Sequence, residues 1–183
     1  LSNPPYHHCN LRQTILEVAL RILAREGASG LSLRDLARVV GVSPAAPYRH
    51  FDSRAALLEA LAVTGFQRFA AAMQEGISSN PPDPLAAMGK SYVLFALENA
   101  NLFRLMFSPD LKQDGRPGLK MAADAAFETL RSAVGGDAQM NRIKALSAWA
   151  KIHGLAVLLL DGQIAIRAGD DMEALIAEII DSL

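Results

Sequence analysis

Three adjacent side chains, Tyr48, Arg49 and His50, carry a hydroxyl, a guanidinium and an imidazole. Such groups hydrogen-bond to phosphates and to the edges of bases. Two small residues, Ala45 and Ala46, come just before them. Small side chains let the backbone approach a groove closely, and an alanine methyl can touch the methyl of thymine. The segment therefore has the composition of a surface that contacts duplex DNA.

A capped helix should precede this segment. Ser32 and Asp35 form a capping box that starts the helix, and Gly41 is placed to end it. Leu33, Leu36, Ala37 and Val40 form its apolar stripe.

The contact segment itself is predicted to be a second, short helix. Ser43 can cap it with Pro44 at its first position, and Phe51 should turn inward as its core anchor. Pro47 should remove the first hydrogen bond of this helix. Two helices joined by a tight Gly-containing turn favour a helix-turn-helix, whose second helix lies in the DNA major groove. An ordinary αα-hairpin is the alternative.

The distribution of charge along the chain also favours a DNA-binding first part. The chain has 183 residues and a formal net charge of −1. Residues 1–54 hold seven Arg against four acidic residues, a net +3, and the remainder carries −4. A basic first part on an acidic body indicates an anionic partner for the first part alone.

The pattern of caps, breakers and apolar stripes predicts an all-α fold with about nine helices. A first helix runs from an Asn10 cap to Gly27, and others follow at about 53–77, 84–96, 101–107, 119–134, 137–168 and 172–183. No stretch alternates long enough to indicate a strand. We expect a three-helix DNA-binding domain over 1–54 and a helical ligand-binding and dimerisation domain over 55–183.

Several motifs resemble the tetracycline-repressor (TetR) family of transcription regulators. The N-terminal matches are Leu31–Ala37 (LSLRDLA), Gly41–Ser43, Tyr48–Phe51 and Arg54–Leu58 (RAALL). The opening Tyr6-His7-His8 and Asn10-Leu11-Arg12 resembles a subset of that family, as does Trp149–Gly154 (WAKIHG). Cys9 stands where this pattern usually has Gly, and Arg54 where it usually has Lys.

The resemblance implies a homodimer that binds a palindromic operator, most often as a repressor, and is released by a small molecule. It also implies DNA-contacting residues, which are Ser32, Arg34, Ser43, Ala45, Ala46, Tyr48, Arg49, His50 and Arg54. A cation at Arg54 would contact phosphate, where Arg can bind in bidentate fashion. No cofactor is implied.

Large apolar side chains at helical spacing could line a ligand cavity between helices, or could be plain core. The candidates are Phe66, Phe69, Met73, Met88, Tyr92, Phe95, Phe103, Phe107, Phe127, Trp149 and His153. His153 lies one turn after Trp149 and could be a haem or metal ligand, a polar contact in the cavity, or a satisfied core residue.

The apolar stretch Gly154–Leu160 predicts a helix buried on every side. A dimer interface formed with the last helix explains this most simply. Its candidates are Gly154, Val157, Leu158, Asp161, Leu175, Ile176, Ile179 and Ile180.

Other classes of protein are disfavoured. His7, His8 and Cys9 are adjacent and cannot easily face one metal ion, so we expect no metal site. We find no phosphate loop, nucleophile elbow or acid–base pair, and therefore expect no enzyme. The longest apolar run has six residues, against about 20 for a membrane span, and no signal peptide is visible, so a cytoplasmic protein is expected. The remaining alternative is an all-helical ligand carrier or interaction module without a DNA role. Salt-dependent binding to duplex DNA would distinguish a regulator from such a protein.

Overall fold

The computed structural model describes residues 11–78, 81–111, 115–134, 138–164 and 171–181. Within those ranges the chain is all-helical, with eight α-helices, three short 3₁₀ segments and no strand. The α-helices are α1 (Leu11–Glu26), α2 (Leu33–Val40), α3 (Arg54–Ser78), α4 (Pro84–Glu98), α5 (Ala100–Met106), α6 (Pro117–Val134), α7 (Ala138–Leu160) and α8 (Met172–Asp181). The 3₁₀ segments are η2 (Ala28–Gly30), η3 (Pro47–Arg49) and η4 (Pro109–Leu111). The all-α prediction is confirmed.

The expected boundaries of α2 are confirmed by its caps. The Ser32 hydroxyl accepts a hydrogen bond from the backbone N–H of Asp35 at 3.4 Å. Gly41 is left-handed, with φ +78°, and its N–H reaches the carbonyl of Ala37 at 3.0 Å. Only the first half of the expected capping box forms, because the Asp35 carboxylate pairs with Arg38 at 2.7 Å.

The short third helix was expected to begin at Pro44, and this is wrong. Residues 43–46 form a turn in which the N–H of Ala46 bonds to the carbonyl of Ser43, and η3 begins only at Pro47. An α-helix from Pro44 would place Pro47 where an N–H must bond back to Ser43. At the first position of a new turn, the missing N–H leaves no bond unmade. Phe51 is buried, as expected.

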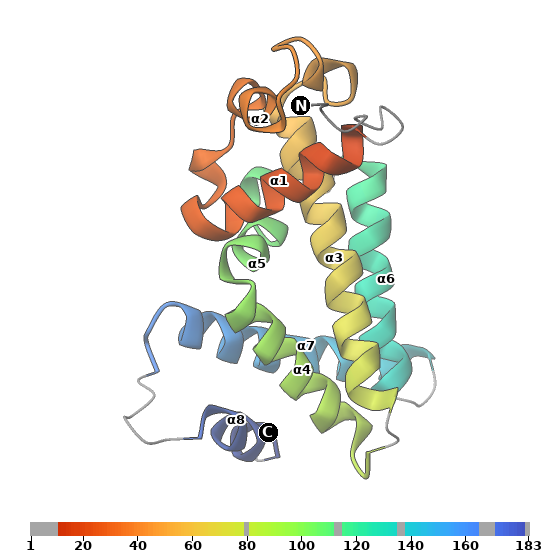
Figure 1. Ribbon diagram of the computed structural model, residues 1–183. Helices are drawn as coiled ribbons and strands as arrows, with labels where there is room; N and C mark the ends of the chain where they lie inside the picture. Colours follow the sequence, from red (N-terminus) through yellow and green to blue (C-terminus); the bar gives the residue numbers. More distant parts are fainter. Residues whose placement is uncertain (1–10, 79–80, 112–114, 135–137, 165–170, 182–183) are drawn as a thin grey trace.

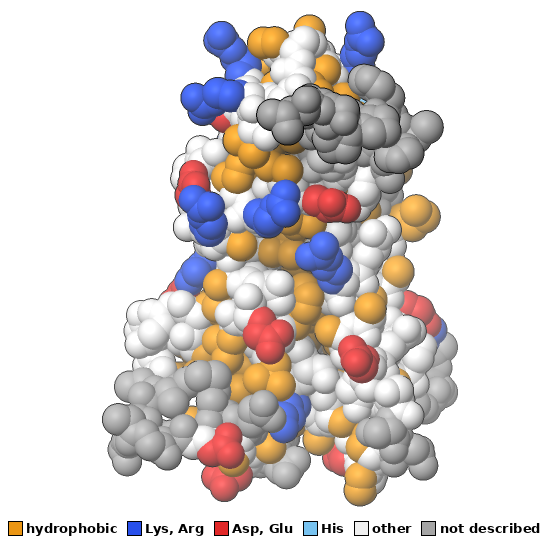
Figure 2. Space-filling view, in the orientation of Figure 1, with side chains coloured by type: hydrophobic (Ala, Val, Ile, Leu, Met, Phe, Trp, Pro, Cys, Tyr) orange, Lys and Arg blue, Asp and Glu red, His pale blue; other side chains and the backbone are white. Residues whose placement is uncertain are grey.

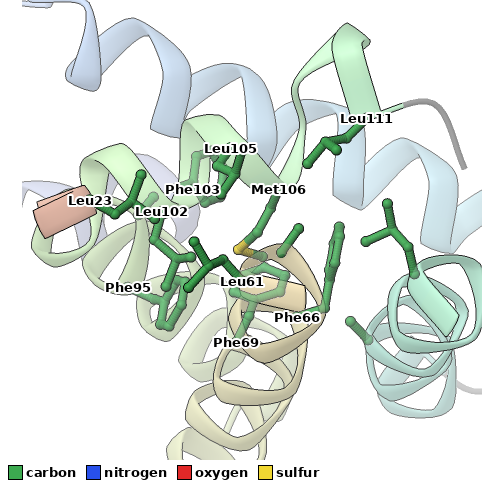
Figure 3. Close-up of a cluster of buried hydrophobic side chains, with 14 of the residues drawn as sticks. Leu23, Leu61, Phe66, Phe69, Phe95, Leu102, Phe103, Leu105, Met106 and Leu111 are labelled. Carbon is green, nitrogen blue, oxygen red and sulfur yellow. The ribbon is translucent and has the colours of Figure 1, made fainter. Parts of the chain in front are cut away.

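The long α3 is the central element and lies beside α6 along much of its length (Figure 1). It also packs on α1, α4 and α5, while α7 crosses the far end of the molecule against α4 and α6. The final helix, α8, packs on α4. One buried cluster runs from the N-terminal helices into the body: Leu23 of α1, Leu61 of α3 and Leu102 of α5 belong to it (Figure 3).

The helix expected over 137–168 ends at Leu160. The chain turns at Gly162, where φ is +66°, and Arg104 of α5 donates to the Leu160 carbonyl at 3.0 Å while pairing with Asp161. Nothing in the sequence before Gly162 predicts this end. Residues 1–10, with the Asn10 cap and the His7-His8-Cys9 arm, and residues 165–168 lie outside the described residues.

One helix, over Asn141–Leu160 of α7, is long and apolar enough to cross a membrane, judged by length and composition alone. Core helices of water-soluble proteins meet the same criterion. The sequence expectation rested on uninterrupted apolar runs, and Lys144 and Lys151 keep the runs of this helix short.

Candidate functional site

The predicted DNA-contacting side chains lie at the end of the molecule that carries α2, where Arg side chains project into solvent (Figure 2). Tyr48, Arg49 and His50 are all exposed, and within the described residues their side chains make no hydrogen bond or ion pair. Arg34 on α2 is likewise exposed. Of the remaining candidates in the turn, Ser43 and Ala45 are exposed and Ala46 is half-buried.

Arg54 is held by the protein itself. Its Nε donates to the carbonyl of Leu31 at 2.9 Å, and its Nη2 donates to the carbonyl of Ala28. These bonds join the first residue of α3 to the first residue of η2 and to Leu31, which directly follows η2. The expected phosphate contact of Arg54 therefore stays a prediction, with fewer free donors than the sequence suggests.

One basic residue near this surface was missed. The guanidinium of Arg12 lies 5.3 Å from the centre of the Phe51 ring, a cation–π arrangement. Phe51 directly follows residues 43–50, the recognition segment. The two residues are far apart in sequence, and Phe51 lies between η3 and α3 outside any helix, so neither spacing nor periodicity signals the contact.

A cavity of about 270 Å³ lies between α3, α4, α6 and α7. Seven of the predicted ligand-site residues line it: Phe66, Phe69, Met73, Tyr92, Phe107, Phe127 and Trp149. The lining residues that were missed are Ala123, Asp124, Ala126, Leu130, Arg142 and Leu146. The prediction rests on aromatic, Met and His side chains at helical spacing, and Ala, Leu and charged residues in the lining carry no such signal.

Four predicted residues do not line this cavity. Met88 is fully buried in α4, and Phe95 packs beside Phe69 with ring centres 5.2 Å apart, so both are core. Phe103 and His153 line a separate hollow of about 280 Å³ between α5 and α7. Helical spacing identifies the apolar side of each helix, but not which part of that side faces a gap.

A hydrogen-bonded chain joins residues that line the two hollows. The indole N–H of Trp149 donates to the Tyr92 hydroxyl at 3.1 Å, and that hydroxyl lies 2.8 Å from His153 Nδ1. Burial raises the pKa of the Tyr92 phenol and lowers the pKa of His153. Tyr92 therefore stays protonated and donates to a neutral His153, which accepts at Nδ1 and carries its proton on Nε2. His153 is thus a satisfied, half-buried residue; the described residues offer no group that could hold a metal.

Acid should weaken the fold through His153. Because its pKa in the folded state lies below the unfolded value of about 6.5, the unfolded chain binds more protons as the pH falls through that value. The stabilising effect of the neutral ring is therefore present above that pH and is lost below it. We expect the melting temperature of the wild type to fall more steeply between about pH 7 and 5.5 than that of His153→Gln.

The control is His50→Gln, which removes one exposed imidazole outside this network. Parallel melting profiles for wild type and His153→Gln would contradict the neutral, accepting role of His153.

The outer face of α7, around Gly154 and Leu158, is apolar and is not covered by other described helices of the chain. A Cβ built on Gly154 would meet open space, and Leu158 is 44% exposed. Ile143, Ala150 and Val157 lie on the same side of the helix by their spacing. Asp161 lies at its end, paired with Arg104.

The expectation that Ile176 and Ile180 form an interface is wrong. Ile176 is 1% exposed and Ile180 9%, both inside the single chain. A Cβ on Gly89 of α4 would lie 2.9 Å from Ile152 and 3.4 Å from Ile180, so the missing side chain of this glycine lets α7 and α8 pack closely on α4. Leu175 and Ile179 remain partly exposed.

Comparison with known families gives two matches. The model of bacterial regulatory proteins of the tetR family matches residues 15–61. The model of the tetracyclin repressor-like C-terminal domain matches residues 85–183, more than half of the chain.

Individual relatives agree with these matches. The HTH-type transcriptional repressor Rv1474c of Mycobacterium tuberculosis is 30% identical over 93% of this chain and 90% of its own length. The tetracycline repressor protein class D of Escherichia coli is 32% identical over 51% of this chain, which spans only 38% of that repressor. Other curated relatives are matched over half of their length or less. A solved structure of a protein with unknown function from Rhodococcus sp. RHA1 is 34% identical, covers 98% of this chain and 96% of its own, and has a TM-score of 0.83.

Proposed function

Because the chain belongs to the tetR family of bacterial regulatory proteins, we propose that it is a ligand-responsive, DNA-binding transcription regulator, most simply a repressor. The observation that carries the proposal is the exposed Tyr48-Arg49-His50 segment, held by a helix-turn-helix scaffold, whose side chains make no hydrogen bond or ion pair among the described residues. Such a regulator would act in the cytoplasm.

DNA recognition would use the turn from Ser43 to His50. The small Ala45 and Ala46 would lie against the floor of the major groove, with Tyr48 and Arg49 reaching base edges or phosphates. Ser32 and Arg34, at the start of α2, would contact the neighbouring phosphates. The hydroxyl of Ser32 accepts from Asp35, so its hydrogen is available to donate.

We further propose that the protein is a homodimer joined along the outer face of α7. This face combines exposed apolar residues with Gly154, which allows a partner helix to approach closely. Burial against a second copy would cover the apolar helix that is long enough to cross a membrane, and no bilayer is needed to explain it. The partly exposed Leu175 and Ile179 of α8 would lie at the edge of the interface.

Ligand binding would act through α5. Phe107, directly after α5, lines the cavity, while Asn101, near its start, donates to the Ala24 carbonyl at the end of α1 at 3.0 Å. A ligand that favours a different placement of α5 would shift the population towards dimers whose recognition segments no longer match the operator.

Selection of bound sequences from random duplex DNA tests this function, and an inverted repeat is the expected result. Two segments related by a two-fold axis must enter major grooves on one side of the duplex, about one helical turn or a multiple apart. Inserting five base pairs at the centre rotates one half-site to the opposite side. We therefore expect affinity to fall to the non-specific level, typically at least about 1,000-fold weaker.

Inserting ten base pairs provides the matched control, because it lengthens the site while keeping both halves on one side. Undiminished affinity after the five-base-pair insertion would contradict dimeric reading. No salt-dependent DNA binding at all would favour a helical ligand carrier instead.

A further inference from the structure

The cavity between α3, α4, α6 and α7 has an uneven distribution of charge at its lining. Two charged residues line it, Asp124 of α6 and Arg142 of α7. The Asp124 carboxylate is already paired with Lys120, one turn earlier on α6. Arg142 is exposed and has no recorded ion pair or hydrogen bond in the described part of the chain. The lining therefore carries one positive charge, at Arg142, that no described residue neutralises in an ion pair.

The interior of the cavity is aromatic, and its polar groups are already engaged. Phe66 meets Phe107 edge-on with ring centres 5.4 Å apart, and Phe127 lies 5.7 Å from Trp149. The Trp149 N–H already donates a hydrogen bond to the Tyr92 hydroxyl. A ligand body inside would gain dispersion and aromatic contacts but few hydrogen bonds, which favours a planar apolar group.

Arg142 lies on the same face of α7 as two apolar residues of the cavity lining. Arg142, Leu146 and Trp149 follow at spacings of four and three residues, so their side chains share one face of α7. A ligand whose ring contacts Trp149 would have its polar end directed along this face towards the guanidinium.

We propose that the effector is a small organic anion: an aromatic body that fills the cavity and a carboxylate, or an equally charged group, that pairs with Arg142. The volume of about 270 Å³ suits a compact ligand, below the usual range for drug-sized molecules. This inference rests on the proposed function, because it names the ligand of the same regulatory cavity.

A matched series of ligands tests the inference: 3-phenylpropanoate, 3-phenylpropan-1-ol and 3-phenylpropan-1-aminium, which share one body and differ in charge. Trp149 is the only tryptophan of the chain and lines the cavity, so its fluorescence reports binding, with calorimetry as a second readout. At low salt we expect the carboxylate to bind about fivefold more tightly than the alcohol, the size of a partly exposed ion pair, and the ammonium to bind most weakly.

Variants of Arg142 assign the preference to its charge. Arg142→Gln should bring carboxylate affinity down to that of the alcohol and leave the alcohol unchanged, while Arg142→Lys keeps much of the preference. The control Lys144→Gln removes an exposed cation of α7 that does not line this cavity, and the preference should persist. The inference is overturned if the ammonium binds most tightly, if Arg142→Gln keeps the preference, or if no member binds at millimolar concentration.

Operator binding by the same preparations separates the two proposals. If the protein binds its operator but the carboxylate fails these tests, only the ligand class is wrong. If the carboxylate binds as expected and the protein ignores duplex DNA, the proposed regulatory function falls and the chemistry of the cavity stands.

Discussion

Arg49→Ala is expected to weaken operator binding at least about 30-fold. Each lost arginine contact to a base should cost about 1–3 kcal/mol, and a dimer loses two of them. The melting temperature should barely change, because the Arg49 side chain is exposed and makes no hydrogen bond or ion pair within the described residues. Electrophoretic or anisotropy titrations with the selected operator, beside thermal melts, measure both effects.

Arg25→Ala is the matched control. It removes the same charge from a side chain that is 78% exposed and makes only a weak 3.4 Å pair with Glu26 at the end of α1. Because overall charge is equal in the two variants, a difference between them reports the position of the side chain. Equal affinities would show that the recognition segment has been placed wrongly.

Leu158→Glu is expected to dissociate the proposed dimer. A carboxylate buried without a partner costs several kcal/mol, and two-fold symmetry places two of them in one interface. The dimer should then weaken at least about 100-fold. Leu158 is 44% exposed in the single chain, so the fold itself tolerates the change. Sedimentation equilibrium measures the association, and circular dichroism verifies that the helices remain.

Met121→Glu controls for adding one exposed carboxylate, since Met121 is 72% exposed and belongs to α6 instead of α7. A Leu158→Glu protein that stays dimeric would move the interface to another surface. A charge at Ile176 could not make this distinction, because that side chain is buried within one chain and its replacement would unfold the protein.

The sequence predicted best those elements whose ends are determined locally. Ser32 and Gly41 cap and end α2 as expected, and Asp83 caps α4 in the same local way, because each acts through hydrogen bonds or backbone geometry within a few residues. Pro84 likewise stands at the first position of α4.

The sequence predicted less well where two local rules compete or where distant packing decides. Pro44 satisfies the rule for a helix start, yet Pro47 prevents the same helix from continuing, and the second constraint prevails. The end of α7 depends on Gly162 and on Arg104 from another helix.

The candidate ligand site shows the same division. Phe66 and Met88 are both large apolar residues at helical spacing, but the first lines the cavity and the second is core. The angles between helices decide which apolar side chains face a cavity.

The 25-residue α3 has a consequence for how operator specificities can be exchanged between relatives. Its first turns place Leu57 and Leu61 in the buried cluster, and its later turns place Phe66 and Phe69 in the cavity wall. Because α3 contributes to both, a hybrid joined beyond residue 54 is spliced within a helix and not in a loop. One residue gained or lost at the splice rotates everything beyond it by about 100°. Recombination that respects this register can graft a new DNA-contacting end onto an old cavity, whereas any other junction breaks the core of both.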